Sequence, residues 1–221
     1  MANLAFADLH GNLSIWRKIQ ERINTNDHVY VLGDAADRGP DGYQIIKEMM
    51  NDSRITYLKG NHDDMFVRGV LEGNTKTLAH WINNCGGRDT YERWRFDGCD
   101  YGMLKWLRSR PLREFLVTSK GLILLSHAGY TPSREPLTSL TDFDFLWDRC
   151  HLYDPWQLGD EDIYVVHGHT PIVLSPWYVS WPESPMFYCD GHKVNIDMCT
   201  FETNVCTLLN LDDFSYEMIK G

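Results

Sequence analysis

The chain has 221 residues, of which 43% are hydrophobic and 24% charged, and its formal net charge is −10. This is the composition of an ordinary globular protein, which excludes a disordered or fibrous chain. The acidic balance disfavours a general binder of nucleic-acid duplexes, because contact with many phosphates needs a basic surface. No apolar run approaches the roughly 18 residues of a membrane-spanning helix, so we expect no membrane partner.

The cysteines and the N-terminal residues point to a reducing compartment. Six cysteines are present without any Cys-x-x-Cys pair, which favours reduced thiols. The first residues lack the basic and long apolar stretches of a signal peptide, so we expect a cytoplasmic protein. No Pro-, Ser- or Gly-rich linker divides the chain. We therefore predict a single domain over residues 1–221, and the oligomeric state stays open.

Strands and helices alternate in the first third of the chain. Short apolar runs predict strands, and apolar residues at helical spacing predict the helices between them. The predicted elements are a strand at 3–8, a helix at 13–23, a strand at 28–32, a helix at 40–49, a strand at 55–58 and a helix at 65–71. This order predicts a parallel sheet with right-handed crossover connections.

The rest of the chain has weaker patterns, and residues 73–120 are expected to form a variable insert of helices and loops. The expected elements are helices at 77–85 and 102–109, a polar irregular loop at 86–101, and strands at 122–126 and 163–166. The arginines and aromatic residues of the 86–101 loop suit either a substrate lid or a solvated loop. The last 40 residues alternate like antiparallel strands that close a second sheet. We expect an α/β (α+β) fold on an N-terminal β-α-β-α-β unit.

Five predicted strands end in charged or metal-binding side chains. These ends are Asp8-Leu9-His10, Gly33-Asp34, Gly60-Asn61-His62, Ser126-His127 and His167-Gly168-His169. One such residue alone is usually a turn or helix-cap residue. Because ligand sites in open α/β sheets lie beyond the carboxyl ends of the strands, five of them predict one shared cleft.

The residue types in this cleft indicate what it holds. Carboxylates, an amide oxygen and imidazoles form a mixed oxygen and nitrogen donor set, and the absence of cysteine disfavours structural zinc. Such a set suits Mn, Fe or Zn, and two ions rather than one. Two ions about 3.5–4 Å apart can clamp the attacking and leaving oxygens of an in-line displacement. Asp34 could bridge them, since each carboxylate oxygen can bind one ion.

Residues beside the expected ligands add further chemistry. Arg38 follows a strand end and suits bidentate contact with phosphate oxygens. His62 follows the ligand candidate Asn61, so its side chain can face the substrate. Paired with Asp37, His62 would be a general acid for a leaving alcohol. Asp37 would keep the imidazole oriented and protonated.

The motifs together resemble a known enzyme family. They are Asp8-Leu9-His10-Gly11, the run Gly33 to Gly39, Gly60-Asn61-His62-Asp63, His127-Ala128-Gly129, Leu146-Trp147-Asp148-Arg149 and Gly168-His169-Thr170-Pro171. This set is similar to the phosphoprotein phosphatases among the calcineurin-like metallophosphoesterases, in the small bacterial and phage branch that includes bacteriophage lambda protein phosphatase. The resemblance covers roughly residues 4–212 and is weak over 73–120. It implies a β-sandwich of two mixed sheets flanked by helices.

The resemblance also implies a role for each matching residue. The first metal would be held by Asp8, His10 and Asp34, and the second by Asp34, Asn61, His127 and His169. A hydroxide bridging the two ions would attack phosphorus. The phosphoryl group would be contacted by Arg38, Arg149 and His62, while His62 with Asp37 would protonate the leaving oxygen. Two divalent ions are the implied cofactors, with manganese expected in vitro and iron or zinc as alternatives.

The substrate is less well determined than the reaction. The resemblance favours a phosphorylated protein, with phosphoserine or phosphothreonine as substrate and phosphotyrosine activity as a companion. Asp63 and the run His127–Pro132 instead resemble symmetrical dinucleoside tetraphosphate hydrolases, which gives a small phosphoester or dinucleotide as the alternative. Asp37 before Arg38 supports the protein phosphatases. A second alternative is a non-catalytic phosphate-binding metalloprotein, and a metal role for His167 is left open.

Overall fold

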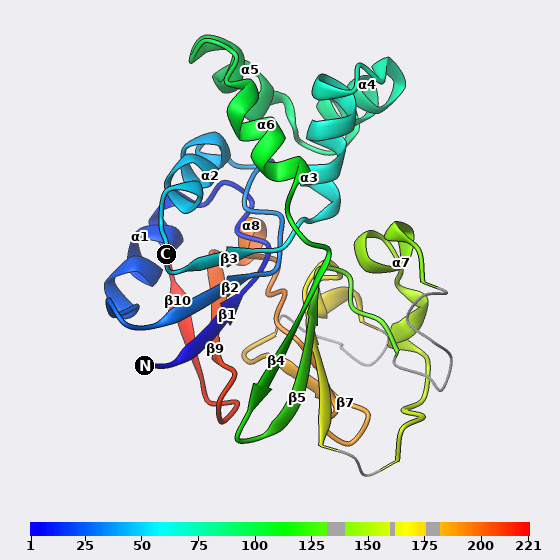
Figure 1. The fold of residues 1–221 in the computed structure, drawn as a ribbon. Helices are drawn as coiled ribbons and strands as arrows, with labels where there is room; N and C mark the ends of the chain where they lie inside the picture. The colour runs from blue at the N-terminus through cyan, green and yellow to red at the C-terminus, as the bar shows by residue number, and fades with distance from the viewer. Residues whose placement is uncertain (132–139, 160–161, 176–181) are drawn as a thin grey trace.

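Two five-stranded sheets form the body of the protein (Figure 1). The computed structural model describes residues 1–131, 140–159, 162–175 and 182–221. Pro132, which belongs to one of the motifs above, lies outside these ranges. Both sheets mix parallel and antiparallel pairs, and helices flank them, so the expected two-sheet architecture is confirmed.

The first sheet contains the predicted N-terminal unit. Its strands lie in the order β10 (Tyr216–Lys220), β9 (Val205–Asn210), β1 (Asn3–Phe6), β2 (His28–Val31) and β3 (Ile55–Tyr57). The neighbours β1, β2 and β3 pair in parallel, as their helical connections require. The strand β9 pairs antiparallel with β1, and β10 pairs antiparallel with β9.

The second sheet shows that one expectation about the C-terminus was wrong. Its strands lie in the order β4 (Arg113–Thr118), β5 (Gly121–Ser126), β6 (Ile163–His167), β8 (Lys193–Asn195) and β7 (Met186–Tyr188). Of the C-terminal strands, only β7 and β8 belong here, and β8 pairs in parallel with β6. The last hairpin joins the first sheet instead, because the crossovers from β1 to β3 leave the other edge of β1 open for β9.

Alternation along the strands places one core between the two sheets. On β1, Ala5 faces the second sheet while Phe6 faces the helices, and on β2 the same holds for Tyr30 and Val31. The inter-sheet core is formed by Ala5, Ala7, Tyr30, Leu32, Leu58, Ile123, Leu125, Val166, Val194, Ile196, Leu209 and Leu211. Burial of this set holds the carboxyl ends of both sheets at one edge.

Helices cover the outer face of the first sheet. The first-sheet helices are α1 (Leu13–Arg22) and α2 (Gly42–Met50), and the Asn12 side chain caps α1 by accepting from the Ile15 amide at 3.1 Å. Several short helices follow strands or connect them: α3 (Asn61–Phe66), the π-helical turn η1 (Val67–Leu71), α7 (Asp142–Leu146), η3 (Cys150–Leu152), η4 (Ile172–Leu174) and α8 (Thr200–Thr203). Within the described ranges, no helix combines the length and the apolar character that crossing a membrane requires.

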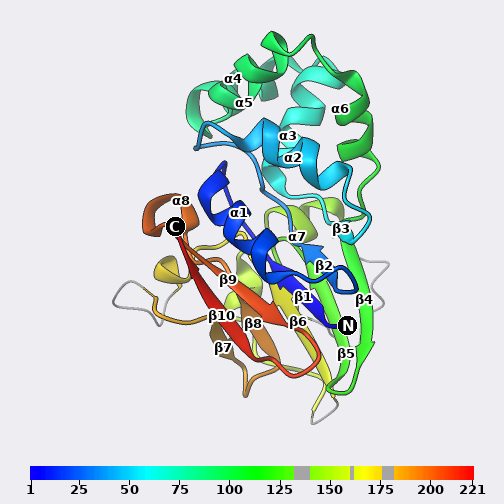
Figure 2. The same cartoon turned by 90° about the vertical axis from the view of Figure 1, so that its left-hand side faces the viewer.

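Three further helices gather at one end of the sheets (Figures 1 and 2). They are α4 (Thr75–Asn84), α5 (Arg88–Phe96) and α6 (Tyr101–Arg108). The prediction of an irregular loop over residues 86–101 was wrong, because α5 occupies most of this segment. Thr90 and Trp94, four residues apart, turn the same face of α5 into the core, and its charged residues face solvent.

Candidate active site

The loops that follow the strands hold their side chains in a backbone conformation that most residues avoid. Positive φ angles between 46° and 71° occur at Asp8, His10, Asp34, Asp37, Arg38 and His169. Such left-handed conformations cost on the order of 1–3 kcal/mol each and gather at functional sites. These six, half of the twelve non-glycine residues with positive φ in the described ranges, are residues that the motifs select.

Two glycines let these loops approach one another. A Cβ atom on Gly60 would lie 2.0 Å from Oδ1 of Asp34, and one on Gly168 would lie 2.1 Å from Oδ2 of Asp8. Any side chain at either position would push a carboxylate away. The glycines therefore permit the close contact of Asp34 with the Asn61 loop and of Asp8 with the His169 loop.

Asp34 lies at the centre of the cluster. Its Oδ1 accepts from the His62 amide at 3.0 Å, and its Oδ2 lies 3.3 Å from Nε2 of His127. Two groups of possible metal ligands share this carboxylate, one with His10 and His62 and the other with Asp8 and His127. The groups differ from the expected ligand sets, which place Asp8 with His10 and leave His62 outside the ligands, but both groups contain Asp34 as expected for a shared carboxylate.

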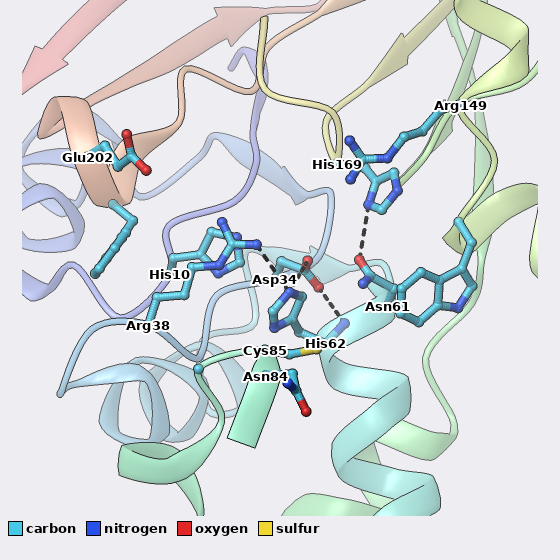
Figure 3. A pocket seen from close by; sticks show the side chains of 13 residues that line it. His10, Asp34, Arg38, Asn61, His62, Asn84, Cys85, Arg149, His169 and Glu202 are labelled. Carbon is cyan, nitrogen blue, oxygen red and sulfur yellow. Dashed lines mark hydrogen bonds and ion pairs between the residues drawn. The ribbon is translucent and has the colours of Figure 1, made fainter. Parts of the chain in front are cut away.

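The predicted ligands of a second ion meet at the side chain of Asn61. Its Oδ1 lies 2.8 Å from Nε2 of His127. The same oxygen lies 3.0 Å from Nδ1 of His169 (Figure 3). On the far side of its ring, His127 contacts the Leu32 carbonyl through Nδ1 at 2.7 Å. That contact orients the ring and leaves Nε2 for the cluster, as a metal-binding histidine needs.

The electrostatics of the site fit divalent cations. Burial, followed by the nearby Asp197 carboxylate, raises the pKa of Asp8 well above its usual value. Burial alone would lower the pKa of His127, but the Asp34 carboxylate raises it to about 10. Buried carboxylates thus demand positive charge, which either protonated imidazole or a metal ion can supply. The donors fit two ions of the transition series.

A second pair of side chains lies beside this cluster. Nδ1 of His62 is 2.7 Å from Oδ2 of Asp37, and Nε2 of His62 is 3.4 Å from Nη2 of Arg38. Burial lowers the pKa of His62, but the Asp34 and Asp37 carboxylates reverse this and the net shift is upward. The two carboxylates therefore stabilise the protonated form of His62.

An open cleft of about 590 Å³ lies above the cluster. Arg38 and Arg149 are exposed at its mouth and reach it from different sides (Figure 3). Buried ligands below exposed guanidinium groups form a site that suits a phosphate with its substituent in solvent. The structure brings together every residue predicted for this site, and their individual roles stay predictions.

Sequence reasoning missed several residues of the cleft. Phe201 and Glu202 also line it, and no motif selects them. Asp197 is a further buried carboxylate that acts on Asp8. Asp197 follows β8, so the strand-end criterion that found the other residues could have found it as well.

Asp63, whose identity resembles the dinucleoside tetraphosphate hydrolases, does not lie in the cleft. It is buried, and its Oδ2 accepts from the Gly60 amide at 2.9 Å and lies 3.0 Å from the Tyr57 hydroxyl. It is absent from the lining of the cleft. Asp63 therefore shapes the turn that carries Asn61 and His62, and does not itself face the substrate.

His167 points away from the cluster. Its Nδ1 lies 3.0 Å from the Gly168 carbonyl, and its Nε2 is 2.7 Å from the Tyr188 hydroxyl. The edge of its ring packs against His151, with 4.8 Å between the ring centroids. Both ring nitrogens of His151 are buried without a hydrogen-bond partner among the described residues.

We expect His151 to make the fold sensitive to acid. Burial, with help from the Lys193 charge, lowers the pKa of His151 to about 3. In the unfolded chain His151 binds a proton near pH 6.5, whereas in the folded chain it stays neutral at that pH. The free energy of unfolding therefore decreases as the pH falls below 6.5. Between pH 7.5 and 5.5 the loss from this group is about 1.4 kcal/mol. Guanidinium unfolding of wild type and His151→Leu at both pH values measures it, and an equal pH dependence in the two proteins would contradict the assignment.

Comparisons with known proteins agree with this geometry. The model of the family described as calcineurin-like phosphoesterase matches residues 2–199. The chain is 26% identical to a symmetrical bis(5'-nucleosyl)-tetraphosphatase of Buchnera aphidicola over 138 residues, which cover 60% of this chain and 46% of that protein. The chain therefore spans about half the length of the curated relatives it matches.

Solved structures show the same fold. A structure assigned provisionally as a diadenosine tetraphosphatase has a TM-score of 0.68 and 14% identity, covering 99% of this chain and 93% of its own. A protein serine/threonine phosphatase from Saccharomyces cerevisiae has a TM-score of 0.61 and 13% identity, covering 100% of this chain and 80% of its own. At these identities the likeness shows the architecture alone.

Proposed function

The chain belongs to the calcineurin-like phosphoesterase family, and on this basis we propose that it is a divalent-metal-dependent phosphoester hydrolase. The observation that carries the proposal is the Asp34 carboxylate, shared by two groups of possible metal ligands below two exposed arginines. Two bound ions would lower the pKa of a water and neutralise phosphate charge. Manganese is the ion we propose for assays in vitro, with iron or zinc as alternatives, and the cytoplasm is the proposed location.

The protein groups have separate tasks in this proposal. The metal ligands are Asp8, His10, Asp34, Asn61, His127 and His169. Arg38 and Arg149 bind the phosphoryl oxygens and orient the group. His62, held by Asp37, gives the proton at Nε2 to the leaving oxygen. A water oxygen joins phosphorus as the bond to the leaving oxygen breaks.

We assign phosphoserine or phosphothreonine in a protein as the first substrate, with phosphotyrosine activity as a companion. The buried His62–Asp37 pair supports this choice, since an alkoxide leaving group is strongly basic and gains most from a proton donor. The openness of the cleft mouth between Arg38 and Arg149 suits a phosphate carried on a polypeptide.

A symmetrical dinucleoside tetraphosphate is the second candidate. The curated relatives named above carry that activity in their names, although this chain spans only about half of their length. The exposed Phe201 and the half-buried Trp147 at the cleft also suit stacking with a base.

A side-by-side assay on manganese-reconstituted protein separates the two substrates. We expect kcat/KM for phosphate release from a phosphothreonine peptide to exceed that for diadenosine tetraphosphate cleavage at least about tenfold. A preference for the dinucleotide would overturn the substrate and keep the reaction. Turnover of neither, together with tight phosphate binding, would mean a non-catalytic metalloprotein.

A further inference from the structure

Trp81 of α4 contacts the proposed acid pair from inside the protein. Its side chain is fully buried, and its indole Nε1 donates a hydrogen bond to Oδ2 of Asp37. The same carboxylate oxygen contacts Nδ1 of His62 at 2.7 Å. The order Trp81–Asp37–His62 therefore connects the helical group formed by α4, α5 and α6 to the cleft through two consecutive hydrogen bonds.

The packing around Trp81 fixes the direction of its N–H. Its ring stacks on Phe66, with 4.7 Å between centroids, and meets the edge of Tyr91 at 6.3 Å. A Cβ on Gly87 would lie 2.2 Å from the indole ring, so only glycine lets the chain pass there. The indole is held on several sides and cannot turn its N–H away from Asp37.

Asp37 depends on these contacts for its own orientation. Its amide donates to Oγ1 of Thr90 on α5 at 3.1 Å. Its other carboxylate oxygen, Oδ1, is buried without a partner among the described residues. The terminal bond of an aspartate side chain rotates easily. Since Oδ2 has two partners and Oδ1 has none, the bonds to Trp81 and His62 set the orientation of the carboxylate.

We propose that Trp81 is a positioning residue for the general acid, an inference that rests on the proposed function. The indole N–H locks the Asp37 carboxylate, and the carboxylate locks the His62 ring with Nε2 toward the leaving oxygen. Helix α4 thereby acts on the proposed acid through Trp81, rather than belonging to a separate insert. Without the Trp81 donor, the buried Asp37 carboxylate would have one unsatisfied oxygen more, and this favours its reorientation.

Leaving-group dependence distinguishes positioning from simple loss of structure. A phosphothreonine peptide leaves as a basic alkoxide and needs the proton from His62, whereas p-nitrophenyl phosphate leaves as a stable phenolate and needs it far less. We expect Trp81→Phe, which keeps a buried ring and removes the N–H, to lower kcat on the peptide about 10- to 100-fold. On p-nitrophenyl phosphate we expect a change below about threefold.

Trp94→Phe is the matched control. Trp94 is also a buried tryptophan of the helical group, and its Nε1 donates to the Asp100 carbonyl at 3.1 Å instead of Asp37. We expect this variant to lose stability like Trp81→Phe while treating the two substrates as wild type does. An equal fall on both substrates in Trp81→Phe, or no fall on either, would overturn the positioning role.

A second readout does not depend on turnover. In zinc-reconstituted protein labelled with ¹⁵N-histidine, the Nδ1 proton of His62 is assigned by its absence in His62→Asn. We expect Trp81→Phe to speed its exchange with solvent at least about tenfold, because local opening of the pair becomes easier. An unchanged rate overturns the inference even if wild type is active, and a wild type that hydrolyses neither substrate overturns only the proposed function.

Discussion

Replacing His62 with Asn lowers turnover of a phosphothreonine peptide by a factor on the order of 10²–10⁴, with metal content unchanged. The amide cannot supply a proton at the position of Nε2, so the alkoxide must leave without protonation. The backbone amide of residue 62 still donates to Asp34 at 3.0 Å, so the metal cluster keeps its central carboxylate in place.

Steady-state kinetics and metal analysis on the same preparation check this prediction. His28→Asn is the control, because His28 lies at the start of β2 and is absent from the lining of the cleft. Its Nε2 contacts the Thr56 hydroxyl at 2.8 Å. We expect the control to turn over as wild type. Unchanged turnover in His62→Asn would remove the general-acid assignment, and a loss of metal in that variant would reassign His62 to the metal cluster.

Replacing Asp34 with Asn removes at least one of the two expected ions and lowers turnover on the order of 10³ or more. The substitution keeps the shape of the side chain and an oxygen for the His62 amide, but removes the charge shared by both ligand groups. A metal site supplies several kcal/mol of charge stabilisation in the transition state, and each 1.36 kcal/mol is a factor of ten.

Metal stoichiometry by mass spectrometry and kcat measured together test the role of Asp34. Asp64→Asn is the control, since Asp64 is a carboxylate close in sequence to the cluster that pairs with Lys59 at 3.6 Å. It should keep both ions and wild-type turnover. Two ions bound with normal activity in Asp34→Asn would show that the shared carboxylate is dispensable.

Most of the site could be predicted from the sequence for a geometric reason. Parallel strands end at the same edge of a sheet, so residues that follow strands far apart in the chain meet at one place. Asp34 and Asn61 are both distant from His127 in the chain, yet an oxygen of each lies within 3.3 Å of its Nε2. The motifs that follow strand ends carry this information locally.

The elements that were predicted wrongly or missed have no comparable pattern in the local sequence. Helix α5 is mostly charged, and only Thr90 and Trp94 are buried, so its apolar stripe is too narrow to stand out. The edge strand β4 is half exposed along its length, and its apolar run is only the three residues Phe115-Leu116-Val117. The hairpin of β9 and β10 could have joined either sheet, and only the open edge of β1 decides between them.

Two functional details also lie beyond local patterns. Trp81 follows helical spacing in an apolar face, so it is expected in the core, and its burial agrees. Its bond to Asp37 spans 44 positions and depends on how α4 packs. The side chain of Asp63 forms part of the same motif as Asn61 and His62, yet it points into the turn rather than the cleft.

A titration of manganese into metal-stripped protein tests whether hydrolysis depends on two bound ions. Bound ions per chain and phosphate release from a phosphothreonine peptide are followed in the same samples. We predict no release without metal, two bound ions at saturation, and activity that rises with metal occupancy in wild type but not in Asp34→Asn. Phosphate release by the stripped protein at the rate of the loaded one would contradict it.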